Sequence, residues 1–105
     1  MHSAVHQAIA AVWRIESARI VAVVARMVRD IGVAEELAQD ALVAALEHWP
    51  REGVPDKPGA WLMTTARHRA LDHLRRAKNL DAKLQEIGRD LQAQEALIVP
   101  DFVDA

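Results

Sequence analysis

The 105-residue sequence has no cysteine and no tyrosine, and aromatic residues make up only 4% of it. Without cysteine, the chain can form neither a disulfide scaffold nor a zinc site with cysteine ligands. Hydrophobic residues still account for 51% of the chain and are rich in alanine and leucine. This composition is typical of a helical bundle and not of a β-sandwich or barrel. We therefore expect one all-α domain with a single core.

Long apolar stretches are also missing. The most hydrophobic segment, IVAVVA, lies between Arg19 and Arg26 and is too short to cross a bilayer. The N-terminal MHSAVHQAIAA lacks the basic start and following apolar stretch of an export signal. We expect a soluble cytoplasmic protein that does not associate with membranes.

Charge is unevenly distributed, although the formal net charge is only −2. Residues 1–50 carry a net charge of −2, residues 51–78 carry +4 and residues 79–105 carry −4. A protein that is basic in one segment only does not have the overall charge of a self-sufficient nucleic-acid binder. If it contacts DNA, we expect a partner to supply the rest of the affinity.

Apolar spacing predicts four helical segments. The first covers about residues 3–30, ends at Gly32 and has an apolar stripe that includes Ile15 and Ile20. The second covers about 33–48 and stops before Pro50. Residues 49–59 hold three of the four prolines and predict a loop.

A third predicted helix runs from about residue 58 to 77, with Pro58 in its first turn. A separate polar helix is expected over about residues 80–97, ending before Pro100, and residues 101–105 are expected to form a frayed tail. The fold predicted is thus a bundle of three main helices with a polar C-terminal helix.

The second helix divides into two faces at about 100° per residue. Its apolar arc contains Leu37, Ala38, Ala41, Leu42 and Ala45. The opposite arc is acidic around a central valine and contains Glu36, Gln39, Asp40, Val43 and Glu47. That arc is either a solvated surface or a docking face for a basic helix.

The third helix has an apolar arc of Leu62, Met63, Ala66, Ala70, Leu71 and Leu74. Its other arc combines a tryptophan with polar and basic groups: Trp61, Thr65, His68, Arg69, Asp72, Arg75 and Arg76, with Arg67 at the edge. Trp61 either caps the core or stacks on a base, and the arginines either bind phosphates or form a solvated helix end.

Other functional classes fit the pattern less well. His68 and His73 lie on different helix faces and no HExxH motif is present, so metal-dependent catalysis is not expected. The connection between the second and third helices is too long for a helix-turn-helix repressor. A helical protein-interaction module that never binds DNA remains the alternative.

Two segments, GVAEELAQDALVAALEHW and GAWLMTTARHRALDHLRR, resemble region 2 of bacterial sigma-70 family RNA polymerase sigma factors. The resemblance extends from about Val12 to Arg76 and is strongest to the extracytoplasmic-function (ECF) group. WRIESARIVAVVARMVRD resembles a subgroup of that group with a C-terminal helical-repeat extension. The resemblance to sigma region 2 implies a sigma region 2-type bundle, no enzymatic activity and no cofactor.

The family resemblance implies two partners. Six residues belong to the family's polymerase-binding motif or to the acidic arc of the same helix. They would contact the β′ clamp helices of RNA polymerase core: Glu36, Leu37, Gln39, Asp40, Val43 and Glu47. Residues that match its promoter-reading helix would contact the −10 element: Trp61, Thr65, Arg67, His68, Arg69, Asp72, Arg75 and Arg76. An anti-sigma protein or a regulatory extension would be a further partner, although no residue indicates one.

The loop would hold a flipped base of the non-template strand, and we assign this role to Arg51, Asp56, Lys57 and Gly59. Relatives commonly have asparagine where His68 stands, and an aromatic and a basic residue where Pro58 and Gly59 stand, which leaves the base preference open. We expect residues 1–78 to form region 2 and residues 79–105 to begin a linker, with region 4 absent from this chain.

Overall fold

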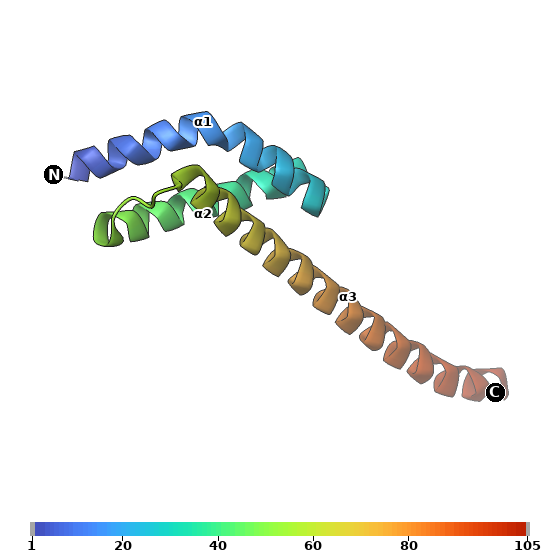
Figure 1. Cartoon of the computed structure of the whole chain (residues 1–105). Coiled ribbons are helices and arrows are strands. Elements are labelled where there is room, and N and C mark those ends of the chain that lie inside the picture. The colour runs from blue at the N-terminus through green and yellow to red at the C-terminus, as the bar shows by residue number, and fades with distance from the viewer. Residues whose placement is uncertain (1, 105) are drawn as a thin grey trace. The chain divides into compact units, whose positions relative to one another are not determined.

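The computed structural model describes the backbone of residues 2–104 and the side chains of residues 4–97, and it contains three helices: α1 (His2–Val28), α2 (Ile31–Glu52) and α3 (Pro58–Asp104). No strand occurs in the described part of the chain, so the predicted all-α class is confirmed. Figure 1 shows α1 and α2 side by side and antiparallel, joined by a short turn. Contacts divide the chain into two units, Met1–Leu74 and Arg75–Ala105.

The turn between α1 and α2 is made by Arg29 and Asp30. Arg29 has a φ of 62°, and its backbone N–H donates to the carbonyl of Ala25 at 2.8 Å. The Asp30 carboxylate then accepts from the Val33 N–H at 3.0 Å, which is an N-cap. The prediction that Gly32 ends the first helix is therefore wrong, because Asp30 caps α2 and places Gly32 inside its first turn.

Helix α2 continues through Pro50 to Glu52 and does not stop before the proline as predicted. A proline near a helix end removes a single backbone donor, so this turn tolerates it better than the middle of a helix would. The helix ends at Gly53, which has a φ of 92° and donates its N–H to the Trp49 carbonyl at 2.8 Å. Only glycine adopts this conformation without strain.

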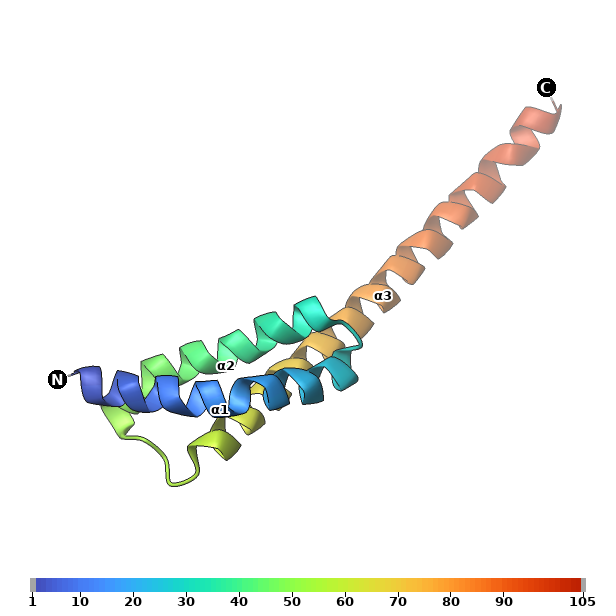
Figure 2. The ribbon, with the colours of Figure 1, turned by 90° about the horizontal axis from the view of Figure 1, so that it is seen from above.

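The core of the first unit combines small residues on α2 with larger ones from α1 and α3. Ala34, Ala38, Ala41 and Ala45 are fully buried, and alanine lets helix backbones approach closely. Figure 2 shows α1 and α2 running along each other. The largest fully buried side chains are those of Trp49, Ile9, Ile20, Leu62 and Val24. Ile15 is exposed, which corrects its predicted place in the apolar stripe.

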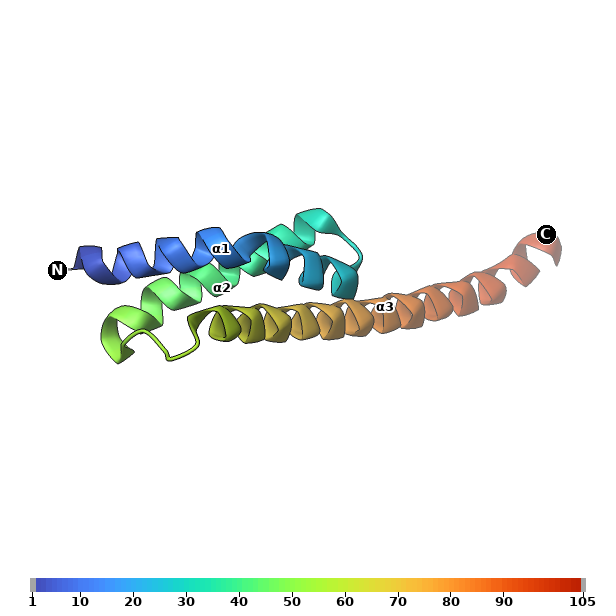
Figure 3. The same ribbon diagram turned by 45° about the horizontal axis from the view of Figure 1, so that its top comes forward.

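Helix α3 is continuous where the sequence predicted two helices with a break near residue 78 (Figure 3). No glycine or proline occurs between Ala60 and Ile87, so nothing local ends the helix. The backbone stays helical through Asp104, beyond Pro100 and into the predicted tail. Leu71 and Leu74 are exposed although their spacing predicted burial. Among the described residues, no helix is apolar over a length that could cross a bilayer.

Candidate functional site

The acidic arc of α2 lies on the surface opposite the alanine core. Glu36, Gln39, Asp40 and Glu47 are exposed, and Val43 at their centre exposes 50% of its surface. Leu37 is half-buried and packs against the core, so it borders this surface and is not part of it. We call Glu36, Gln39, Asp40, Val43 and Glu47 the acidic face.

The carboxylates of the acidic face are not neutralised within the domain. In the described part of the chain, Glu36, Asp40 and Glu47 take part in no salt bridge; the ion pairs seen join Arg19 to Glu16 and His48 to Glu52. The face is thus a cluster of free carboxylates around an apolar side chain, which can bind a basic surface.

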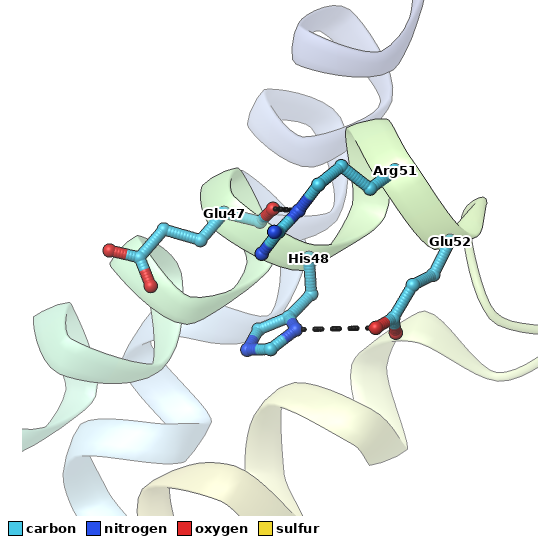
Figure 4. A network of polar contacts seen from close by, with 4 residues as sticks. All are labelled: Glu47, His48, Arg51 and Glu52. Atoms are coloured by element: carbon cyan, nitrogen blue, oxygen red, sulfur yellow. Dashed lines mark hydrogen bonds and ion pairs between the residues drawn. The ribbon is translucent and has the colours of Figure 1, made fainter.

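The last turns of α2 order the side chains next to this face (Figure 4). The Arg51 Nε donates to the backbone carbonyl of Glu47 at 3.1 Å, while the Glu47 carboxylate points away from it. His48 Nδ1 lies 3.5 Å from Glu52 Oε1. Arg51 was predicted in the loop, but it belongs to α2 and caps a carbonyl at the helix end, where positive charge is favourable.

Trp61 is half-buried in the first turns of α3 and packs against the core. Its ring centroid lies 5.4 Å from that of the buried Trp49, with an interplanar angle of 72°, and 6.3 Å from the ring of His48. Trp61 therefore caps the core, and its indole lies against the rings of two α2 residues, Trp49 and His48. Sequence reasoning missed both neighbours, because it took Trp49 as loop and assigned no role to His48.

The remaining predicted DNA-contacting residues of α3 within the first unit differ in their exposure. Arg67, His68 and Arg69 are exposed. Thr65 and Asp72 are half-buried, and the Thr65 hydroxyl donates to the Trp61 carbonyl at 2.9 Å. A shallow hollow is lined by Thr64, Arg67, His68 and Leu71. In the second unit, Arg75 and Arg76 are exposed.

The loop between α2 and α3 is shorter than predicted and covers residues 53–57. Asp56 and Lys57 are exposed in it, whereas Gly59 lies in the first turn of α3. A Cβ added to Gly59 would come within 3.0 Å of the Glu16 side chain of α1. The glycine therefore allows α3 to begin close against α1.

No group of three or more histidine, cysteine, aspartate or glutamate side chains is placed to hold a metal ion in the part of the chain that the structure describes. His68 is exposed and Asp72 is half-buried on α3. What the residues do form is an acidic face on α2 and a basic face on α3.

The family of the chain follows from comparison with known proteins. Residues 12–80 match the family model described as sigma-70 region 2. The chain is 39% identical over 72 residues to a Rhizobium meliloti protein described as uncharacterized, covering 68% of this chain and 17% of that protein. It is 35% identical over 82 residues to "Probable ECF RNA polymerase sigma factor SigI" of Mycobacterium tuberculosis, covering 78% of this chain and 28% of that protein.

The chain belongs to the sigma-70 region 2 family, and its similarity to SigI places it with the ECF type. This confirms the family predicted from the two motifs. The family is not a class of enzymes. The chain spans less than a third of the length of these curated relatives. No solved structure matches it significantly.

Proposed function

We propose that this domain acts in transcription initiation as region 2 of an ECF sigma factor. It docks through the acidic face on the β′ clamp helices of RNA polymerase core and presents α3 and the preceding loop to the promoter −10 element. The observation that carries the proposal is the acidic face itself. Its carboxylates are exposed and unpaired on a domain of this family.

Docking through α2 follows from charge and shape. Glu36, Asp40 and Glu47 surround Val43, so a basic helix would gain both charge complementarity and a small apolar contact. Leu37, on the same helix as the acidic face, packs against the core and so holds α2 in place. Because the face is solvent-exposed, binding there is expected to weaken as salt increases.

The DNA-facing role rests on Trp61 and the basic side chains beyond it. Packing against the buried Trp49 restricts the Trp61 ring, so less conformational entropy is lost when a base stacks on it. Arg67 and Arg69 are exposed and suited to phosphates, and His68 between them is suited to a base edge.

Promoter opening then follows from preferential binding of the single-stranded −10 bases. Unstacking a base step costs a few kcal/mol, and stacking a base on an aromatic side chain returns roughly 1–3 kcal/mol. Stacking on the single Trp61 ring therefore offsets the cost of unstacking at most one base step. The polymerase must therefore share the work, which agrees with a chain whose overall net charge is −2.

A strand-binding experiment tests the DNA-facing half of the proposal. Polymerase core is saturated with the domain, and the anisotropy of a labelled −10 non-template strand is titrated with the complex. We expect Trp61→Ala and Arg67→Ala each to weaken binding, and Arg89→Ala, an exposed arginine outside the proposed surface, to leave it unchanged. Helical content and unfolding midpoints identify variants that fail to fold.

The alternative function, a helical interaction module without DNA binding, predicts a different outcome. The domain would bind core or another protein, and the single strand would bind no more tightly with the domain than without it. Equal binding by the wild type and by Trp61→Ala would also reject the stacking role of this ring.

A further inference from the structure

Residues 75–97 of α3 carry an apolar stripe that nothing in the domain covers. Leu80, Leu84, Ile87 and Leu91 recur at intervals of four, three and four residues, which is the a/d spacing of a coiled coil. Each exposes between 48% and 61% of its surface. Sequence analysis interpreted this segment as a polar linker because charged residues separate the leucines.

The heptad register follows from this spacing. Leu84 and Leu91 occupy a positions, and Leu80 and Ile87 occupy d positions. The flanking g positions then hold Arg76, Lys83 and Asp90, and the e positions hold Asp81, Gly88 and Glu95. Charges at g and e decide orientation and partner in coiled coils.

An antiparallel arrangement of two copies satisfies both the stripe and its charges. When Leu84 packs opposite Ile87 of a second copy, Leu80 falls opposite Leu91, and all four central layers are filled by leucine or isoleucine. The antiparallel geometry pairs g with g and e with e. Lys83 then faces Asp90 of the second copy, twice by symmetry, and Asp81 faces the uncharged Gly88.

Other arrangements leave like charges opposed. In a parallel pair, g faces the following e of the partner, so Asp90 would face Glu95 in both halves of the dimer, which offsets the attraction of Arg76 for Asp81, and Lys83 would face the uncharged Gly88. Shifting the antiparallel register by one heptad places Lys83 opposite Lys83 and Asp81 opposite Asp81, or places Asp90 opposite Asp90. Like charges at these positions oppose pairing.

We propose that residues 75–97 form an antiparallel coiled coil with a second copy of this chain, in the register that pairs Lys83 with Asp90. The pairing removes the exposed leucine stripe from water, which stabilises a long helix that is marginal alone. The contacts that define the pairing, from Leu80 to Leu91, lie outside the acidic face and outside the residues proposed to contact DNA, so the proposal goes beyond the function proposed above.

Sedimentation equilibrium of residues 1–105 over a wide range of concentrations tests the pairing. We expect a reversible monomer–dimer equilibrium. Leu84→Asn should raise the dissociation constant by about a hundredfold or more, because the change recurs in both central layers. Lys83→Glu alone, or Asp90→Lys alone, should raise it about tenfold, because each opposes like charges at two symmetric sites. Arg89→Glu, at an outward f position, is the matched control and should have no effect.

The decisive variant combines Lys83→Glu with Asp90→Lys. In the proposed register Asp90→Lys alone opposes Lys83 and the second change restores opposite charges, whereas in a parallel pair Asp90→Lys alone would face Glu95 and strengthen pairing. We expect this double variant to dimerise like the wild type. A monomer at all concentrations would overturn the proposal and leave the stripe to another protein or another part of the same chain. A dimer that Leu84→Asn does not weaken, or that the double variant does not restore, would overturn the proposed surface or its register. Circular dichroism confirms that each variant stays helical.

Discussion

The rings of Trp61 on α3 and Trp49 on α2 form a T-shaped pair with a centroid separation of 5.4 Å and an interplanar angle of 72°. One ring is 1% exposed and belongs to the core, whereas the other is half-buried at the surface. This contact couples the stability of the bundle to the orientation of the ring proposed to stack on promoter DNA. Edge-to-face geometry is a favourable arrangement for aromatic pairs.

Truncating the inner ring should damage both properties. We expect Trp49→Ala to destabilise the domain by about 3–5 kcal/mol, because it empties the largest buried site in an alanine-rich core. Urea unfolding followed by circular dichroism measures this. Trp13→Ala, which removes a partly buried indole on α1, is the control and should cost less. Equal losses would show that Trp49 has no special place in the core.

The Asp30 cap predicts a smaller and purely local effect. Asp30→Ala removes the acceptor for the Val33 N–H and should destabilise the domain by about 0.5–2 kcal/mol. Asp56→Ala removes an exposed loop carboxylate and should be close to neutral. The comparison uses the same urea titration, and a neutral Asp30→Ala would mean that the cap contributes nothing to α2.

The close approach of α3 to α1 predicts a compensating pair of substitutions. Gly59→Val puts a branched side chain where Glu16 atoms lie within 3.1 Å of the Cβ position, so we expect a loss of about 1–3 kcal/mol. Glu16→Ala removes the obstructing atoms and should recover most of that loss in the double variant. Additive losses in the thermodynamic cycle would contradict the contact.

Base-reading and phosphate-binding residues should separate by their salt dependence. Arg69→Ala removes a proposed phosphate contact and should weaken −10 strand binding for every sequence, lowering the salt slope by about one. His68→Ala should instead relax the preference for one base, with a change of about 1–3 kcal/mol in discrimination. Titrating the polymerase–domain complex against a set of single-base −10 variants at several salt concentrations distinguishes the two. The reverse assignment would contradict the proposed roles.

The acidic face could be predicted because a single physical rule determines it. Alanines at positions 34, 38, 41 and 45 fill one side of α2, so Glu36 and Asp40 must lie on the other. The first of the two family motifs lies on this helix, and the comparison confirmed the family that the motifs predicted.

Helix ends were predicted less well, because local signals compete. Gly32 and Pro50 both suggest a helix stop, but the Asp30 cap and the Gly53 conformation determine where α2 begins and ends. The error at Pro50 also placed Trp49 in the loop and hid its contact with Trp61. Periodicity likewise predicted burial of Leu71 and Leu74, because it shows which face is apolar but not how far along the helix that face is covered.

Calorimetric titration of the domain with a purified β′ clamp-helix fragment tests the central claim most directly. We predict salt-sensitive binding that a Glu36→Lys, Asp40→Lys variant abolishes while its helical content and melting remain those of the wild type. A Glu35→Lys, Glu86→Lys variant makes the same change in net charge at exposed sites outside the acidic face and should bind normally. A folded wild type that does not bind, or equal loss of binding in both variants, would contradict docking through the acidic face.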